Sequence, residues 1–274
     1  MSPLRSLKLG IVGCGAIGSR IAMSVRKELK NRFLVSALYD IDTEKAFSLS
    51  ARLRARSIVK TTLAQLIQES DLVLECVNTS ATVDIVRQSI RAGKNIMVMS
   101  IGRLSGHPSV FALARKNGIS LLLPSGSIAG LDAVKAATLA GKVSVTLTTR
   151  KPPAGFLGNP YLVSRKVSLE GITKEKLLFD GNALDAVRRF PQNINVAAVL
   201  RLALGSASSL RVRIIADPSV RSNIHEIVLD GPAGRVVTRT ENNVCPDNPK
   251  TSYLAVLSGI QTLKQYFDCI KIGT

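Results

Sequence analysis

The stretch Leu7–Gly18, LKLGIVGCGAIG, decides the fold that we predict for this chain. Its apolar run Leu7–Val12 predicts a buried parallel strand, and helix-forming residues follow. The three glycines have GxGxxG spacing: the first permits a tight turn, the second lets a pyrophosphate approach the backbone, and the third lets helix and strand pack closely. The N–H groups and the helix dipole would face the phosphates. The residues expected to bind a dinucleotide here are Gly13, Gly15, Ala16, Ile17 and Gly18.

An acidic residue follows the second apolar run. Phe33–Tyr39 ends in Asp40, 22 residues beyond Gly18. At this position a carboxylate binds the ribose 2′-hydroxyl of NAD and repels the 2′-phosphate of NADP. The alternative is that Asp40 only caps the next helix. We expect NAD as the cofactor, with NADP as the alternative because Lys45 lies close enough in sequence to approach a 2′-phosphate.

The first half of the chain alternates strands and helices. Further strands are predicted at 57–59, 72–77, 95–99 and 119–123, with helices between them. This alternation predicts an N-terminal Rossmann domain with a doubly wound, mostly parallel sheet. Asn78 follows the run 72–77, at the edge of the sheet where ligands bind, so it either contacts the cofactor or caps the following helix.

The pattern changes at Pro124. Half-buried strands are predicted at 143–149, 211–216 and 224–229, and a helix at 195–204. Few crossover helices predict an α+β domain with a mixed or antiparallel sheet, open on one face. This domain would serve catalysis and dimerisation, so a homodimer is expected. The segment Asn248–Ser252, NPKTS, predicts the start of a C-terminal helix that returns to the first domain. The predicted domains are 1–123 plus 249–274, and 124–248.

Composition narrows the functional classes. The chain has 37 Lys and Arg against 19 Asp and Glu, a formal charge of +18, but no run of consecutive basic residues accounts for it. Aromatic residues make up 4% and Trp is absent, which disfavours nucleic-acid binding. The absence of a signal or membrane-length apolar run predicts a soluble, cytoplasmic protein. The four isolated cysteines predict buried free thiols and no metal site.

Five segments in order resemble the L-aspartate dehydrogenase family, and with the glycine loop the resemblance covers nearly the whole chain. The segments are PSGSIAGLDA (124–133), TRKPP (149–153), FPQNINVAA (190–198), ADPSVRSNIHEI (216–227) and ENNVCPDNPKTS (241–252).

This resemblance implies NAD(P)-dependent oxidation of L-aspartate to iminoaspartate, which hydrolyses to oxaloacetate and ammonia or feeds quinolinate synthesis in NAD biosynthesis. The reverse reductive amination is implied as well. The resemblance places the catalytic histidine at His225 and cofactor contacts at Ser127 and Asn193. Ser127 stands where the family leads us to expect alanine, and Cys245 where we expect serine.

The residues themselves agree with this chemistry. Oxidation of an amine needs proton transfer around neutral pH, which suits a histidine. Strand alternation places Asn223 on the same face as His225, where it can orient the substrate or the imidazole. The two carboxylates of aspartate need basic partners. The predicted substrate-binding residues are Lys151, Asn223 and Lys250, with Arg150 as a further candidate and solvent contact as the alternative for Lys250.

Two other functions fit the fold. One is a dehydrogenase acting on another amino acid or small substrate. The other is a non-catalytic dinucleotide-binding or nucleic-acid-associated protein that uses the +18 charge. The second alternative predicts steeply salt-dependent binding to DNA or RNA.

Overall fold

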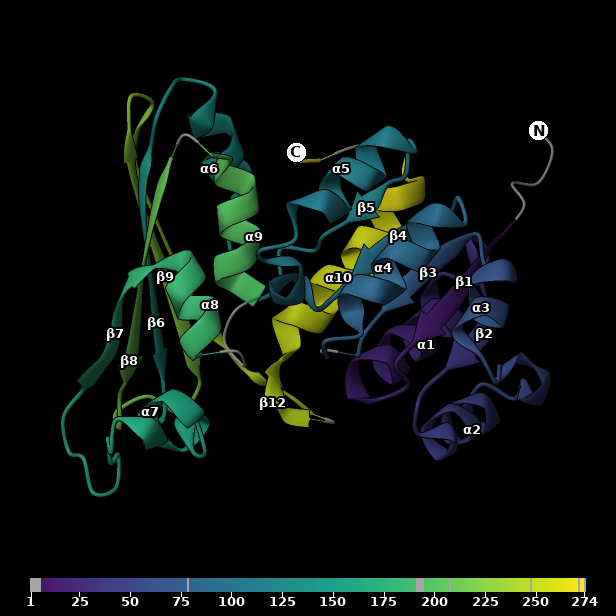
Figure 1. The fold of residues 1–274 in the computed structure, drawn as a ribbon, viewed down its shortest axis with the longest axis horizontal. Helices are drawn as coiled ribbons and strands as arrows, with labels where there is room; N and C mark the ends of the chain where they lie inside the picture. The colour runs from purple at the N-terminus through teal and green to yellow at the C-terminus, as the bar shows by residue number, and fades with distance from the viewer. Residues whose placement is uncertain are drawn as a thin grey trace. The chain divides into compact units, whose positions relative to one another are not determined.

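The computed structural model describes residues 6–77, 79–190, 195–206, 208–246, 248–270 and 272–273, with the backbone alone for 248–250. The chain forms two compact units (Figure 1). The first is Met1–Pro124 with Val256–Ile270, and the second is Ser125–Ala255 with Lys271–Thr274. The domain boundaries expected from the sequence, after residues 123 and 248, stay predictions.

The first unit contains the predicted parallel sheet. Its strands follow the order β2-β1-β3-β4-β5, and all neighbours run parallel. Because β1 pairs with both β2 and β3, the strand order reverses between β1 and β3, where open α/β sheets bind ligands. The strands are β1 Leu7–Val12, β2 Phe33–Tyr39, β3 Leu72–Glu75, β4 Asn95–Val98 and β5 Leu121–Leu122.

The strand predicted at 57–59 is wrong. Arg56–Ile58 is a 3-10 helix, and Val59 makes a single bridge to Leu38. The run is too short to extend this pairing, so the sheet has five strands rather than six. The strand predicted at 119–123 narrows to two paired residues for the same reason, since the chain runs beside β4 only at Leu121–Leu122.

Helices cover both faces of this sheet. Val12 belongs to a buried cluster with Val86 of α4 and Val110 of α5, whereas Ile11, which points the other way, lies beside α1. Helix α10 packs on α1, where Gly259 approaches Ile21. The helices are α1 Ala16–Glu28, α2 Thr43–Arg52, α3 Leu63–Gln68, α4 Thr82–Arg91, α5 Pro108–Lys116 and α10 Tyr253–Phe267.

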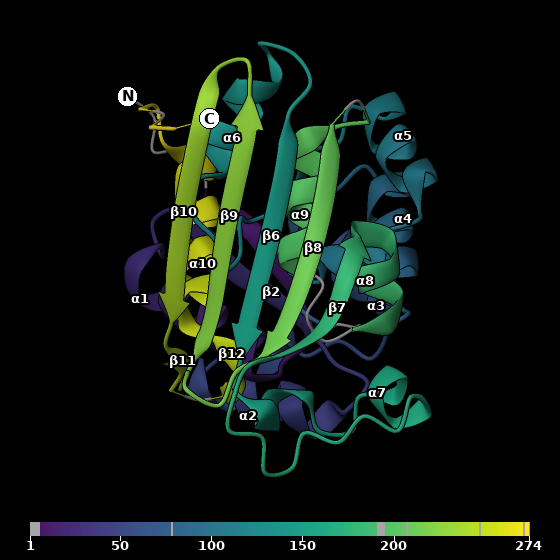
Figure 2. The same ribbon diagram turned by 90° about the vertical axis from the view of Figure 1, so that its left-hand side faces the viewer.

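The second unit is built on the predicted mixed sheet. Its order is β10-β9-β6-β8-β7, in which only β6 and β8 are parallel. Figure 2 shows the open face of this sheet, with α6, α8 and α9 behind it. The strands are β6 Ser144–Lys151, β7 Lys176–Asn182, β8 Ser209–Ala216, β9 Asn223–Gly231 and β10 Gly234–Asn242. The helices are α6 Leu131–Thr138, α7 Pro160–Ser164, α8 Ala183–Arg189 and α9 Asn195–Leu204.

Two of these strands, β7 and β10, were not predicted from the sequence. The edge strands β7 and β10 are largely exposed, so their sequences KLLFDGN and GRVVTRTEN show no continuous apolar run. Strand β10 forms only because it pairs with β9 through a tight hairpin, from Gly234 opposite Gly231 to Asn242 opposite Asn223.

The predicted helix start at NPKTS is also wrong. Asn248–Ser252 forms strand β12, which pairs antiparallel with β11, Val244–Cys245, and α10 begins only at Tyr253. Pro249 is compatible with a short two-stranded ribbon because each strand there has a free edge. Within the described part of the chain, no helix is both long enough and apolar enough to cross a membrane.

Candidate active site

The glycine loop after β1 is packed tightly against β3. Gly13 has φ +97°, and a Cβ at this position would lie 2.9 Å from the carbonyl carbon and oxygen of Cys76. A Cβ at Gly18 would lie 2.0 Å from the Gly13 carbonyl oxygen. These two positions therefore require glycine, as the GxGxxG spacing predicts.

Gly15 has a different environment. It is the N-cap of α1, and a Cβ there would meet no atom of the described residues within 4 Å. Space is thus open in front of the first backbone N–H groups of α1, which begins with Ala16 and Ile17. An anionic pyrophosphate fits this arrangement because helix N-termini supply unpaired donors and positive potential.

Asp40, the residue after β2, is hydrogen-bonded to the same glycine loop. Its Oδ2 accepts a hydrogen bond from the Cys14 N–H at 2.7 Å, and its Oδ1 accepts one from the Asp42 N–H at 3.0 Å. The N-cap of α2 is Asp42 rather than Asp40, so the capping alternative is wrong. Lys45 forms an ion pair with Asp42 at 3.1 Å. Asp40 is thus held beside the glycine loop, in the position expected of a ribose ligand.

The two thiols near this loop stay protonated near neutral pH. Burial, and secondarily the charge of Asp40, raises the pKa of Cys14 to about 12. Burial also raises the pKa of Cys76. The expectation of buried thiols is confirmed for Cys14 and Cys245, whereas Cys76 is half-buried and Cys269 is exposed beyond the end of α10. All four cysteines are free.

Some predicted site residues cannot be placed. Asn78 and Asn193 lie outside the described residues. The side chain of Lys250 also lies outside the described part of the structure, although its backbone belongs to β12. Their roles in binding cofactor or substrate stay predictions.

In the second unit, His225 lies in a row of paired residues. It sits on β9 opposite Thr149 of β6 and Thr240 of β10. The Thr149 hydroxyl and His225 Nδ1 share a hydrogen bond of 3.0 Å, and both residues are buried. Asn223 lies two residues along β9 and therefore on the same face, as predicted. His225 is thus fixed by its neighbours rather than free in solvent.

This row lies on the face of the sheet that α8 covers. Thr149 aligns with Ile214 of β8, which aligns with Phe179 of β7. The Phe179 ring contacts Phe190, the residue after α8, with centroids 6.0 Å apart.

Hydrogen bonds connect Ser127 to the same row. Its carbonyl oxygen accepts from Thr240 Oγ1 at 2.9 Å and from Asn242 Nδ2 at 3.0 Å. Thr240 Oγ1 also lies 3.4 Å from the His225 carbonyl oxygen, and the Ser252 hydroxyl donates to Asn242 Oδ1 at 3.0 Å. The loop expected to contact the cofactor is therefore hydrogen-bonded to β10, the strand that pairs with β9 beside His225. Sequence reasoning missed Thr149, Thr240 and Asn242 because only the strand register brings them together.

Burial changes the proton chemistry of this site. It lowers the pKa of His225 from 6.5 to about 3, and the nearby charge of Lys151 acts in the same direction. Burial also lowers the pKa of Lys151 from 10.5 to about 8. Near neutral pH, His225 is therefore a neutral imidazole and a weaker base than the histidine expected from the sequence, and Lys151 loses its proton at a lower pH than an exposed lysine does.

Arg150 and Lys151, the two basic residues of TRKPP, point to opposite faces of the sheet. Lys151 lies two residues beyond Thr149 on β6 and shares its face. Arg150 points to the opposite face, where its Nε lies 3.5 Å from Glu175 and 4.0 Å from Asp217. Of these two candidates for a substrate contact, the structure places only Lys151 with His225.

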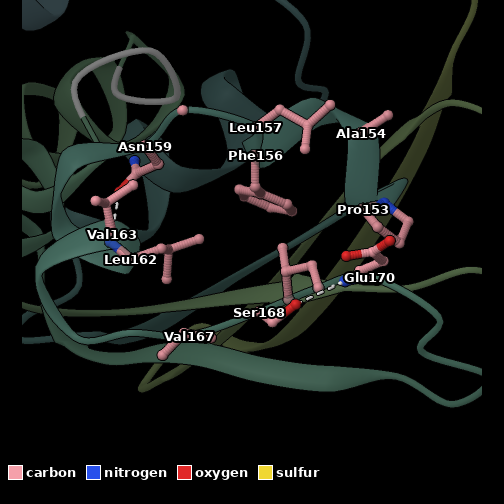
Figure 3. Close-up of a pocket in the computed structure, with 12 residues that line it drawn as sticks. Pro153, Ala154, Phe156, Leu157, Asn159, Leu162, Val163, Val167, Ser168 and Glu170 are labelled. Carbon is pink, nitrogen blue, oxygen red and sulfur yellow. Dashed lines mark hydrogen bonds between the residues drawn. The ribbon is translucent and has the colours of Figure 1, made fainter.

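A separate pocket of about 480 Å³ opens beyond the end of β6 (Figure 3). Its walls come from the 3-10 helix Pro153–Phe156, from α7 and from residues 167–170. The lining is mainly apolar, with Phe156 and Leu162 at its inner side and Glu170 among the few polar residues. It contains none of the predicted site residues.

The neutral state of His225 makes a testable contribution to stability. Between pH 6.5 and about 3, the unfolded chain binds a proton at residue 225 that the folded chain does not. The free energy of unfolding therefore decreases as the pH falls, by about 2 kcal/mol near pH 5. Urea unfolding followed by circular dichroism at pH 7 and pH 5 would measure this, and His225→Asn should remove that part of the loss. His107→Asn, which alters the other histidine, is the control, and an equal acid sensitivity of His225→Asn and wild type would contradict the assignment.

Two family models match the chain. Residues 13–124 match the model described as "Homoserine dehydrogenase, NAD binding domain". Residues 132–266 match the model described as "Aspartate dehydrogenase, C-terminal". The two matches follow each other along the chain, the first including the glycine loop and the second including His225.

Relatives match over nearly the whole length. The chain is 44% identical to an L-aspartate dehydrogenase of Methanosarcina barkeri over 98% of this chain and 100% of the relative. It is 41% identical to an L-aspartate dehydrogenase of Methanococcus maripaludis with the same coverage. Among solved structures, an aspartate dehydrogenase of Thermotoga maritima has a TM-score of 0.71 at 23% identity, covering 98% of this chain and all of that one. At that identity the structural match supports the fold.

Proposed function

The chain belongs to the L-aspartate dehydrogenase family, and from this premise we propose how its residues oxidise L-aspartate. The protein is an oxidoreductase that converts L-aspartate to iminoaspartate with a nicotinamide dinucleotide. The imine then hydrolyses to oxaloacetate and ammonia, and reductive amination is the reverse reaction. The observation that carries the proposal is the row Thr149–His225–Thr240, which holds a neutral imidazole beside Lys151.

The cofactor would be held by the first unit. When bound, NAD accepts the hydride from the substrate α-carbon. The backbone of Gly13–Gly18 would bind the pyrophosphate, and Asp40 the adenosine ribose. Ser127, Asn78 and Asn193 stay predicted cofactor contacts. Asp40 supports NAD as the preferred cofactor because its carboxylate is already oriented by the Cys14 N–H and would repel a 2′-phosphate.

We assign proton transfer to His225. A neutral imidazole can hydrogen-bond to the water that attacks the imine and relay its proton, and Thr149 fixes the ring through Nδ1. Asn223, on the same face, would orient the substrate. Lys151 and Lys250 would bind its carboxylates.

One assay tests the reaction and substrate together. Purified protein is mixed with NAD or NADP and a panel of L-amino acids, and reduced nicotinamide is followed by absorbance. Reduction that depends on L-aspartate supports the proposal. Reduction with another amino acid alone supports the first alternative, and binding of NAD without any reduction supports a non-catalytic role. The family relationship favours neither alternative.

Cofactor preference has its own test. Asp40→Asn removes the charge that would repel the 2′-phosphate, so the ratio of kcat/KM with NADP to that with NAD should rise at least ~10-fold, equivalent to about 1.4 kcal/mol. Glu44→Gln, at an exposed acidic residue in the first turn of α2, is the matched control and should leave the ratio unchanged. An unchanged ratio in Asp40→Asn would remove Asp40 from the ribose site.

We also propose a cytoplasmic homodimer. The free thiols support a reducing compartment. The open sheet face supports the dimer because it exposes Val237, at 58%, paired with Val228 among charged side chains. Light scattering would test the oligomeric state. Use of iminoaspartate for quinolinate synthesis is proposed on the family resemblance.

A further inference from the structure

Three side chains of different chemistry gather on one face of the second sheet. Thr149 and Lys151 are two residues apart on β6, and His225 is the direct partner of Thr149 on β9. Thr149 is 2% exposed and His225 is 5% exposed. Residues two apart on a strand, and residues directly paired across strands, share a face. The register of the sheet therefore places Lys151 on the same face as Thr149 and His225.

The stem of Lys151 is held in place. A Cβ at Gly155 would lie 3.6 Å from both Cβ and Cδ of Lys151, so the lysine stem packs over the 3-10 helix Pro153–Phe156. The Asp217 N–H donates to the Lys151 carbonyl oxygen at 2.9 Å, which anchors the end of β6 to the end of β8. This hydrogen bond fixes the backbone of Lys151, and the packing shields part of its side chain from water.

The charged side chains on the neighbouring strands and on α8 contact one another or aromatic rings. Arg150, Glu175 and Asp217 interact on the opposite face of the sheet. Arg189 of α8 stacks on the rings of Tyr161 at 4.9 Å and Phe179 at 5.5 Å. His225 is the titratable group that β9 presents on the face of Lys151, and it is neutral near pH 7.

We propose that Lys151, in its neutral form, is the general base that removes the proton from the substrate α-ammonium group. This inference rests on the proposed function and places Lys151 at the substrate α-amino group in place of a carboxylate. Burial supports it, because the pKa of Lys151 falls to about 8, so a useful fraction of the amine is unprotonated near neutral pH.

The ε-amine of Lys151 takes one proton, becoming an ammonium, and the substrate nitrogen becomes an amine. The nitrogen lone pair then forms the C=N bond as hydride leaves the α-carbon for the oxidised nicotinamide ring, giving an iminium and reduced cofactor. Water adds to the iminium carbon and loses a proton to His225, which passes this proton to the nitrogen as the carbinolamine collapses to oxaloacetate and ammonium. Lys151 returns its proton to solvent before the next turnover.

Two variants separate a base from a charge. Lys151→Arg keeps the positive charge but cannot accept a proton at working pH, so kcat for L-aspartate oxidation should fall at least ~10²-fold while KM for aspartate changes little. Lys151→Ala should lose kcat similarly and regain part of it when methylamine or ethylamine is added. Lys174→Ala, at an exposed lysine, is the matched control and should behave as wild type.

The pH profile gives a further readout. In wild type, kcat/KM for aspartate should rise with pH through an apparent pKa near 8, because the base must be deprotonated. This rise should disappear in Lys151→Ala. Bound NAD, measured by calorimetry, confirms that each variant is folded, and amine rescue of Lys151→Ala tests the role even where Lys151→Arg does not fold.

The outcomes are distinguishable from failure of the proposed function. Wild type that does not oxidise aspartate would overturn the proposed function. Active wild type, together with near-normal kcat in Lys151→Arg, would overturn only the role of Lys151 as base. A Lys151→Ala variant that shows no amine rescue and keeps the wild-type pH profile would also overturn the role of Lys151 as base.

Discussion

Replacement of His225 by Ala is expected to lower kcat for aspartate oxidation by at least ~10²-fold, the usual scale for a group that transfers protons. Affinity for NAD should stay within about threefold of wild type, because the predicted pyrophosphate and ribose contacts lie in Gly13–Gly18 and Asp40. Steady-state kinetics and calorimetric titration with NAD would measure the two effects.

A second variant separates chemistry from packing in this experiment. His225→Ala leaves the buried Thr149 hydroxyl without its imidazole partner, which costs stability as well as activity. The amide of His225→Asn can still hydrogen-bond to Thr149 but cannot act as a base. Both variants should therefore lose activity, with His225→Asn retaining more of the thermal stability. Near-normal turnover in His225→Asn would remove His225 from proton transfer.

The glycine loop gives the other large effect, through two variants with opposite signatures. Gly18→Ala places a methyl group 2.0 Å from the Gly13 carbonyl oxygen, so the free energy of unfolding should fall by about 3 kcal/mol. Gly15→Ala places its methyl group in space that the described residues leave open, so its stability should change by less than about 1 kcal/mol.

NAD affinity completes this comparison. The methyl group of Gly15→Ala would occupy the position expected for the pyrophosphate, so Kd for NAD should rise at least ~10-fold in a fully folded protein. Urea unfolding and calorimetric titration measure the two quantities. Unchanged affinity in Gly15→Ala would show that the phosphates bind elsewhere, and normal stability in Gly18→Ala would contradict the close packing of α1 on the loop.

The two halves of the fold differed in how well sequence predicted them. In the first unit, Leu7–Val12 is a largely buried strand and Phe33–Tyr39 a partly buried one, both are apolar runs flanked by amphipathic helices, and their local patterns sufficed. In the second unit, β10 became a strand only by pairing with β9, and its exposed residues gave no pattern to detect. Asn248–Ser252 resembled a helix start because Asn, Pro, Thr and Ser are common there, yet strand pairing with Val244–Cys245 prevailed.

The sequence by itself determined the glycine loop, the acidic residue after β2 and the mixed second sheet, because each depends on residue types and local spacing, and the family resemblance pointed to His225. Only the tertiary structure decided what surrounds His225. Thr149 is 76 residues away along the chain and Thr240 is 15 away, and both arrive through strand register. Burial then lowers the pKa of His225 to about 3 and that of Lys151 to about 8. No local pattern encodes desolvation, because it depends on every segment that packs over the site.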